Sequence, residues 1–251
     1  MSEVVVIGLG QLGRVFAGAL LRAGHTVVPA NRGDDLAALA QRHPDPALVL
    51  VAVGENDLRA ALAAVPAAWK PHAALIQNEL LPRDWEAHGY ADPTVISVWF
   101  EKKKGTDARP LISSPVAGPG AALLIAALAS IDLPAREVAS GEALLFELVV
   151  KNVYILTTNI AGLRTGGTVS QLWAQHEAFA RTVASEVMDI QDRLAGHAFD
   201  REKLVAGMLE AFAGDPEHGC TGRSAPARLA RALGHADRFD LAVPTLRALA
   251  A

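Results

Sequence analysis

The first half of the chain alternates short apolar runs with segments of helical periodicity. Apolar runs that predict strands lie at residues 4–7, 25–29, 48–53, 73–76 and 95–99, with a further candidate at residues 110–113. Between them, residues 12–23 and 58–65 carry a helical pattern. Strands that are apolar on both faces are typical of parallel sheets covered by helices. The pattern therefore predicts an α/β fold with a doubly wound parallel sheet over residues 1–137.

The pattern changes after about residue 137, where strand signals disappear. Residues 142–162, 172–194 and 201–212 predict long helices, and Gly- and Pro-rich breaks are expected at residues 214–222 and at Gly234. The second half, residues 138–251, is therefore predicted to be an all-helical domain.

Composition excludes several classes of protein. The net charge of −4 does not suit a nucleic-acid binder, and the basic run at residues 102–104 is expected to be a solvated loop. The longest apolar stretch, residues 121–131, is too short to cross a bilayer of ~30 Å as a helix, so no membrane partner is expected. A single cysteine, Cys220, permits no internal disulfide and suits the reducing cytoplasm. We expect this thiol to be inert.

Other chemistries are not indicated. The histidines of the second half are scattered without metal-ligand spacing, so no metal site is expected, and no G-x-S-x-G of a serine hydrolase is present.

A glycine motif follows the first predicted strand. Gly8-Leu9-Gly10-Gln11-Leu12-Gly13 is a G-x-G-x-x-G between a strand and a helix, which is the context of a dinucleotide-binding turn. In such a turn the first glycine makes the tight bend, and the second lets the pyrophosphate approach the backbone. The third allows close packing of helix on strand. The helix N-terminus, at Gln11 and Leu12, would present N–H groups to the phosphates.

The residues after the second strand select the cofactor. NAD sites usually place an acidic residue there, whereas this chain has Asn31 and Arg32. Because a guanidinium pairs well with a 2′-phosphate, the sequence predicts NADP(H) with Arg32 as its phosphate partner. The alternative is that Arg32 is an ordinary surface charge. Asp34 and Asp35 would oppose a phosphate if they turned inward.

Ligands of such folds bind at the carboxyl ends of the strands. Val53 and Gly54 follow the third strand, and Asn78 follows the fourth. We expect all three to contact the cofactor, and the Asn78 amide can donate and accept hydrogen bonds toward the nicotinamide or the substrate.

A polar stripe marks the first long helix of the second half. Lys151, Ile155 and Asn159 are spaced by four, so successive positions lie ~40° apart on one face. A lysine within an apolar run is costly unless it is paired or faces a wet cleft. Two interpretations stay open here: an exposed Lys151 paired with Glu147, or a Lys151 that faces a site.

The stripe lies in KNVYILTTNIAGL, which resembles the K-x-x-x-N-x-x-x-N-P-L-T-A of ketopantoate reductases, within the 6-phosphogluconate-dehydrogenase-like group. The opening GLGQLGRVFAGALLRAGHTV and LVLVAV followed by LIQNEL also resemble this family. The resemblance implies a Rossmann domain followed by a helical domain, a keto-acid-like substrate and a homodimer. It also implies that Lys151 is the general acid, and that Asn159, Asn78 and Ser224 orient the substrate.

The chain departs from the family pattern as a short, divergent member would. Ile155 replaces the first asparagine, Gly54 replaces a cofactor-contacting lysine, and Glu79 replaces the glycine of Q-N-G. The late catalytic glutamate has no clear counterpart, and Asp237 is the nearest by spacing.

The leading hypothesis is an NADPH-dependent reductase of a 2-keto acid or a related carbonyl. The alternatives are a nucleotide-binding sensor without turnover, and an imine- or opine-type reductase or deazaflavin-linked enzyme.

Overall fold

The computed structural model describes residues 2–102 and 105–250. Of the basic run expected to form a loop, residues 103 and 104 lie outside the described residues. The chain divides into two compact units, Met1–Glu147 and Leu148–Ala251. The division falls inside a helix, later than the expected boundary at residues 137/138, because that helix begins while its first residues still pack with the first unit.

The first unit is built on a seven-stranded sheet in the order β2-β1-β3-β4-β5-β8-β9. All neighbouring strands in it are parallel except β5 and β8. A separate two-stranded sheet is formed by β6 and β7. The strands are β1 (Glu3–Ile7), β2 (Thr26–Ala30), β3 (Leu48–Val51), β4 (Ala73–Leu75), β5 (Thr94–Ile96), β6 (Phe100–Glu101), β7 (Arg109–Pro110), β8 (Ser114–Ala117) and β9 (Ala135–Glu137).

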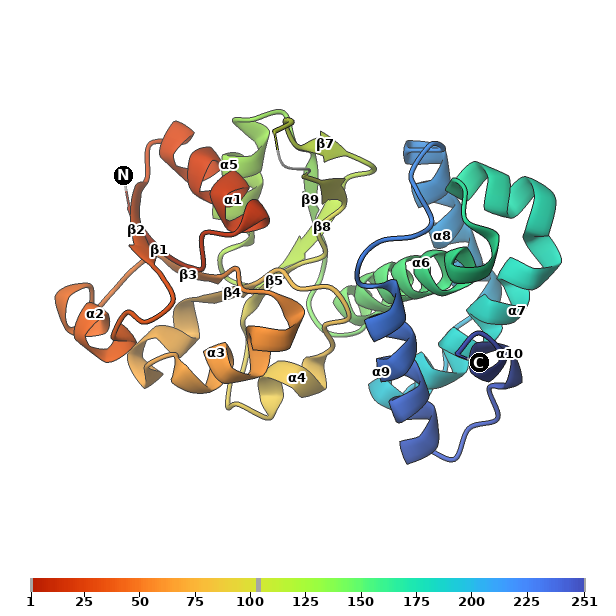
Figure 1. Cartoon of the computed structure of the whole chain (residues 1–251). Coiled ribbons are helices and arrows are strands. Elements are labelled where there is room, and N and C mark those ends of the chain that lie inside the picture. Colours follow the sequence, from red (N-terminus) through yellow and green to blue (C-terminus); the bar gives the residue numbers. More distant parts are fainter. Residues whose placement is uncertain (1, 103–104, 251) are drawn as a thin grey trace. The chain divides into compact units, whose positions relative to one another are not determined.

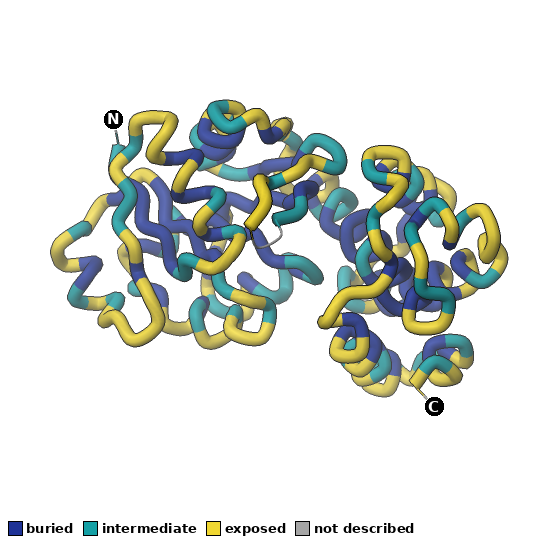
Figure 2. Tube along the Cα trace, turned by 45° about the horizontal axis from the view of Figure 1, so that its top comes forward, coloured by how far each residue is buried: buried dark blue, intermediate teal, exposed yellow. Residues whose placement is uncertain are grey.

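Helices cover both faces of this sheet, as a doubly wound fold requires (Figure 1). On one face α1 and α5 pack together, and their apolar side chains share a core with the central strands. The other face carries α2, α3 and α4. The buried strands form the dark centre of the unit in Figure 2. The helices are α1 (Gln11–Arg22), α2 (Leu36–Arg42), α3 (Leu58–Ala64), α4 (Pro82–Glu86) and α5 (Ala121–Ala129), with 3₁₀ turns η1 (Glu55–Asp57) and η2 (Ala67–His72).

The sheet differs from the sequence prediction near its far edge. Of residues 110–113, which were expected to form a strand, only Pro110 lies in one, β7, and β8 begins after them at Ser114. Strand β5 ends at Ile96 rather than near residue 99. Between β5 and β8 the chain forms the β6–β7 pair rather than a crossover helix, and such a connection suits an antiparallel neighbour. Residues 121–131, too short to span a bilayer, form α5 against the sheet.

The second unit is helical, as predicted, and α6 is its centre. Each neighbouring helix meets α6 through a specific contact: α7 through the Asn152–Gln191 hydrogen bond, α8 through the Tyr154 and Phe212 rings, and α9 through the Asn159–Arg228 hydrogen bond. The helices are α6 (Glu142–Thr165), α7 (Val169–Ala195), α8 (Arg201–Gly214), α9 (Ala225–Arg238) and α10 (Pro244–Ala248).

The break predicted at Gly234 is wrong, because α9 continues through it. A glycine inside a helix costs only about 1 kcal/mol, and the buried Ala232 and Ala236 on either side keep the helix packed. The end of the chain is held by the buried Glu186 of α7. Its carboxylate accepts hydrogen bonds from the backbone N–H groups of Thr245 and Leu246 at the start of α10.

Helix α6 has the length and composition of a membrane span, but 67% of its most apolar window is buried within the protein. Its apolar character is therefore that of the core helix around which the second unit packs.

Candidate functional site

The candidate region of the first unit is the turn between β1 and α1. Gly8 has φ +93°, a backbone conformation that favours glycine, and its N–H donates to the Ala30 carbonyl at 2.9 Å. A Cβ on Gly13 would lie 2.0 Å from the Gly8 carbonyl oxygen, so α1 can approach the turn this closely only with glycine there. A Cβ on Gly10 would meet nothing within 4 Å. The turn thus has the tight bend and the close packing of a dinucleotide-binding loop.

The N-terminus of α1 is open to an anion. Gly10 precedes the helix without any side-chain hydrogen bond to it, and the exposed Gln11 and half-buried Leu12 follow. Backbone N–H groups in such a first turn can bind phosphate oxygens. The residues present therefore fit the pyrophosphate of a dinucleotide.

The loop after β2 is organised by its acidic residues. Asp35 caps α2 by accepting from the backbone N–H groups of Ala37 and Ala38. Asp34 accepts from the backbone N–H of Asn31 at 2.7 Å. Arg32 extends into solvent, with its side chain 88% exposed, and pairs with Asp57 of η1 at 2.9 Å. The Arg32 guanidinium is thus exposed just after β2, where a bound anion would compete with the Asp57 carboxylate for it.

The carboxyl ends of β3 and β4 are fastened together by Gln77. Its Nε2 donates to the carbonyl oxygens of Val51 and Val53 at 2.6 and 3.2 Å, and its Oε1 accepts from the Ile76 N–H. This buried clamp fixes the position of the turn that carries Asn78 and also that of the half-buried Val53. Sequence reasoning singled out Asn78 and missed the structural role of Gln77.

Glu79, which stands where the Q-N-G pattern has its glycine, lies in a left-handed turn after β4. Glu79 has φ +60°, the left-handed conformation that a glycine would adopt at lower cost. The turn after β4 therefore has the backbone shape expected of a Q-N-G. The neighbouring Asn78 is half-buried, and Gly54 lies exposed before η1.

The candidate region of the second unit is the polar face of α6, and Lys151 is its main feature. Lys151 is buried, with 9% of its surface exposed, and its ammonium lies 5.4 Å from the centre of the Tyr154 ring. Glu147, the partner considered for an exposed lysine, instead bonds Arg136 at 2.5 Å. The burial of Lys151 therefore excludes the interpretation of an exposed surface lysine.

Burial also changes the acidity of Lys151. Desolvation first, and the positive charge of Arg228 second, lower the pKa of its ammonium from 10.5 to about 7. An amine with such a pKa can give up and regain a proton near neutral pH, which is what a general acid requires.

Asn159 lies two helical turns after Lys151 on the same stripe, and it is buried and hydrogen-bonded to α9. Its Oδ1 accepts from Nη1 of Arg228 at 2.8 Å, and both side chains are more than nine-tenths buried. Ile155 lies half-buried between Lys151 and Asn159 on the same face of the helix. The stripe seen in the sequence is therefore polar at its two ends and apolar in the middle.

A close approach of two segments brings α9 to this face. A Cβ on Gly162 would lie 2.7 Å from Cβ of Cys220, so the loop before α9 can rest directly on α6 only because Gly162 has no side chain. Cys220 is buried, and desolvation raises the pKa of its thiol to about 11, which disfavours a nucleophilic thiolate.

Ser224 lies immediately before α9 and, unlike Lys151 and Asn159, is not buried. It is exposed, and its hydroxyl makes no hydrogen bond that caps the helix. Arg228 lies one turn later and points into the core. Sequence reasoning missed Arg228. The signal that could have found it is an arginine one helical turn after the serine matched to the substrate site.

Asp237, the nearest match to the late acid by spacing, lies in α9 nine residues after Arg228, roughly 14 Å further along the helix axis. Its exposed carboxylate pairs with Arg247 at 2.6 Å.

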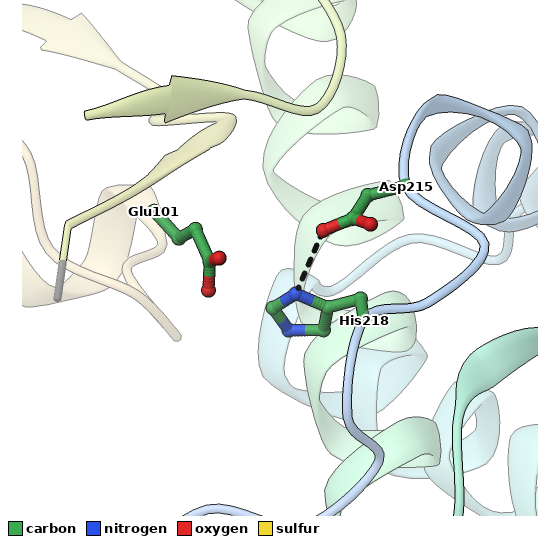
Figure 3. A group of neighbouring side chains, drawn as sticks. All are labelled: Glu101, Asp215 and His218. Carbon is green, nitrogen blue, oxygen red and sulfur yellow. Dashed lines mark ion pairs between the residues drawn. The ribbon is translucent and has the colours of Figure 1, made fainter. Parts of the chain in front are cut away.

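An acidic and a basic residue do lie close to Tyr154. The His218 ring is 6.2 Å from the Tyr154 ring, centre to centre, and its Nδ1 is 3.5 Å from the Asp215 carboxylate (Figure 3). The loop that carries them is anchored to the start of α7, because the His218 carbonyl accepts from the Val169 N–H. The His218 ring thus lies near the same Tyr154 ring that the Lys151 ammonium faces.

Comparison with known proteins gives similarity at the level of the fold. No family model and no curated protein matches the chain. Among solved structures, 2-dehydropantoate 2-reductase from Methylococcus capsulatus is similar with a TM-score of 0.70 and 15% identity, covering 99% of this chain and 94% of the other. A ketopantoate reductase from Ralstonia eutropha JMP134 has a TM-score of 0.69 and 18% identity over 99% and 96% of the two chains.

A D-mandelate dehydrogenase in complex with NADH is also similar, with a TM-score of 0.67 and 12% identity over 98% and 96% of the two chains. The chain therefore has the two-part fold of ketopantoate reductases along almost its whole length, with a sequence far from theirs.

Proposed function

We propose that this protein is an NADPH-dependent reductase that converts a 2-oxo acid, or a related carbonyl compound, into the corresponding alcohol. The observation that carries the proposal is Lys151, a buried amine whose pKa lies near neutrality, on the same helix face as Asn159. The fold shared with ketopantoate reductases supports the same reading.

The dinucleotide would be held by the first unit. Gly8, Gly10 and Gly13 shape the turn that receives the pyrophosphate, and the first N–H groups of α1 bind its oxygens. When bound, NADPH supplies the hydride that the carbonyl carbon accepts. Val53, Gly54 and Asn78, at the ends of β3 and β4, would contact the nicotinamide end.

Preference for NADPH over NADH is proposed from Arg32. Its exposed guanidinium can pair with a 2′-phosphate, and Asn31 beside it can donate a further hydrogen bond. Asp34 and Asp35 do not argue against this, since their carboxylates are engaged with backbone N–H groups of their own loop.

Lys151 would complete the reduction by donating a proton. As the carbonyl carbon gains a hydride, negative charge develops on its oxygen, and the ammonium stabilises that charge and transfers a proton to it. The neutral amine then regains a proton from solvent. Asn159, Asn78 and Ser224 would orient the substrate by hydrogen bonds.

The cellular setting is proposed by the same reasoning. A chain with one buried cysteine has no need of an oxidising compartment, so we propose the cytoplasm. A homodimer is proposed by analogy, since one structural neighbour is a dimeric ketopantoate reductase.

The test is a panel of 2-oxo acids with NADPH and, in parallel, NADH, followed by the loss of reduced-nicotinamide absorbance. Lys151→Ala should lower turnover by roughly 10²- to 10⁴-fold while nucleotide affinity is kept. Lys203→Ala, at an exposed position of α8, is the matched control. Unchanged turnover in Lys151→Ala on a confirmed substrate would exclude the general-acid role.

A second candidate is a nucleotide sensor that has lost turnover. The observation in its favour is that Asp237, the nearest match to the late acid, is exposed and forms an ion pair with Arg247. Saturable binding of NADPH with no reduction of any carbonyl in the panel would select this candidate.

A further inference from the structure

The arginine that directly follows the glycine turn folds back onto it. Arg14 comes next after Gly13, in the N-terminal turn of α1, and its side chain is exposed. Nε of Arg14 donates a hydrogen bond to the Leu9 carbonyl at 3.0 Å, within the turn itself. The guanidinium is therefore held against the turn that would receive the dinucleotide.

Arg14 also lies on the same face of α1 as Gly10. The two residues are four positions apart, and the Arg14 N–H donates to the Gly10 carbonyl at 3.1 Å. Side chains of a helix lean toward its N-terminus, which directs Arg14 toward Gly10. Gly10 is where the turn is open, because a Cβ there would meet nothing within 4 Å, whereas Cβ atoms on Gly8 and Gly13 would meet backbone oxygens at 3.1 and 2.0 Å. The guanidinium thus lies beside the open part of the turn.

The charge of Arg14 is unfavourable at this position unless an anion joins it. The N-terminal turn of a helix carries a partial positive charge, and α1 has no acidic residue there to offset a cation. Among the residues that the structure describes, the polar partner of the Arg14 side chain is the neutral Leu9 carbonyl alone. A bound diphosphate would offset both positive charges, since the helix N–H groups and the guanidinium would face the same anion.

The contact with Leu9 leaves the outer end of the guanidinium available. Only Nε is used, so the N–H groups on Nη1 and Nη2 of Arg14 keep their capacity to donate. Arginine pairs with two phosphate oxygens through such neighbouring N–H groups. Because the Nε contact already restrains the side chain, binding an anion costs less side-chain entropy.

We infer that Arg14 binds the diphosphate bridge of the nicotinamide dinucleotide, from the open side of the turn at Gly10. The inference rests on the proposed function, since it concerns the same cofactor. It gives the two arginines different tasks. Arg14 binds the bridge that NADPH and NADH share, and Arg32 binds the 2′-phosphate that only NADPH has. Arg14 therefore contributes affinity for both dinucleotides, whereas Arg32 selects between them.

The test is equilibrium binding of NADPH, NADH and ADP-ribose to the full-length protein, measured by calorimetric titration without any substrate. ADP-ribose keeps the diphosphate and lacks both the nicotinamide and the 2′-phosphate. Arg14→Gln should weaken the affinity for all three compounds by the same factor, roughly 10-fold, which is the lower end for a hydrogen bond between charged groups. Arg32→Gln should weaken the affinity for NADPH alone. Arg22→Gln, at an exposed position in the last turn of α1, is the matched control and should bind as wild type does.

A merely structural role of the contact between Arg14 and Leu9 predicts a different result. The melting temperature without nucleotide is compared between wild type and Arg14→Glu, which reverses the charge. An acidic side chain suits the N-terminal turn of a helix, so Arg14→Glu should melt no lower than wild type, while its dinucleotide affinity falls further than that of Arg14→Gln. A lower melting temperature, with equal affinities in the two variants, would show that the residue only holds the turn and would overturn the inference.

Salt gives an independent measurement of the same contact. Raising the ionic strength should weaken ADP-ribose binding by wild type more than by Arg14→Gln, because salt screens the attraction between an exposed guanidinium and the diphosphate. The same salt dependence in both proteins would mean that the charge of Arg14 does not contact the ligand, and the inference would fail.

The outcomes separate this inference from the proposed function. The titrations need no turnover, so a wild-type protein that binds dinucleotides but reduces no carbonyl supports the role of Arg14 and removes only the reductase activity. Wild-type affinities in Arg14→Gln overturn the role of Arg14 and leave the cofactor site standing. A loss confined to NADPH also overturns it, since Arg14 would then contact the 2′-phosphate. A wild-type protein that binds none of the three compounds overturns both proposals.

Discussion

Replacing Lys151 by methionine should stabilise the protein at neutral and acidic pH. In the folded protein the pKa of Lys151 is about 7, whereas its ordinary value is 10.5. A difference of about 3.5 in pKa corresponds to about 5 kcal/mol. At a pH where Lys151 is protonated in both the folded and the unfolded state, its buried charge lowers the free energy of unfolding by this amount. Methionine has a similar length and no charge, so Lys151→Met removes this destabilisation. The variant loses about 1 kcal/mol of it again, because the contact between the ammonium and the Tyr154 ring is lost.

The pH dependence follows from the direction of the shift. Between pH 7 and 10.5 the unfolded chain binds a proton at Lys151 that the folded protein has released, so wild-type stability rises with pH in this window. The advantage of Lys151→Met is therefore largest below pH 7. It should decrease by about 3 kcal/mol between pH 6 and pH 9.

The assay is urea unfolding of wild type and Lys151→Met at pH 6, 7.5 and 9, followed by circular dichroism of helix content. Because the chain has two compact units, the comparison concerns the transition that carries most of the helical signal. Lys203→Met measures the effect of the same substitution at an exposed position of the second unit. A Lys151→Met variant that is no more stable than wild type at pH 6, or whose difference does not change with pH, would refute the reasoning.

Three further predictions concern the reaction and the cofactor. The rate of carbonyl reduction should fall as pH rises through about 7, because the proton donor Lys151 is then deprotonated; Arg228→Gln should move this fall to higher pH, since it removes a charge that lowers the pKa. A pH profile that does not change in that variant would contradict the coupling. Gly13→Ala should abolish NADPH binding and cost about 1–3 kcal/mol in stability, because its Cβ would lie 2.0 Å from a carbonyl oxygen; a thermal melt and a fluorescence titration check both effects. Asp57→Ala should increase NADPH affinity up to about fivefold by releasing Arg32, and an equal gain for NADH would show that the guanidinium does not recognise the 2′-phosphate.

Local features of the first unit could be predicted from the sequence because each depends on a few adjacent residues. The turn at Gly8 and Gly13 is such a case, since the positive φ and the close contact both require residues without a side chain. The central strands were likewise predictable, because a strand buried on both faces must be apolar throughout. The direction of β8 was not, because strand direction is decided by the connection and by pairing with β5 rather than by composition.

In the helical unit, too, local features could be predicted from the sequence and packing could not. Three long helices follow from their periodicity, and the stripe of Lys151, Ile155 and Asn159 follows from a spacing of four. Periodicity could not decide whether that stripe faced solvent, and the burial of Lys151 settled the question.

The sequence could not predict which residue contacts this stripe of α6. Arg228 meets Asn159 across 69 residues of chain, and the contact exists because Gly162 lets the loop before α9 lie on α6. By itself the sequence determined where the long helices α6, α7 and α8 form and which residues of α6 share a face, since both follow from local backbone geometry. Only the tertiary structure decided which helices pack together, and packing is what buries Lys151 near the charge of Arg228 and so lowers the pKa of its ammonium.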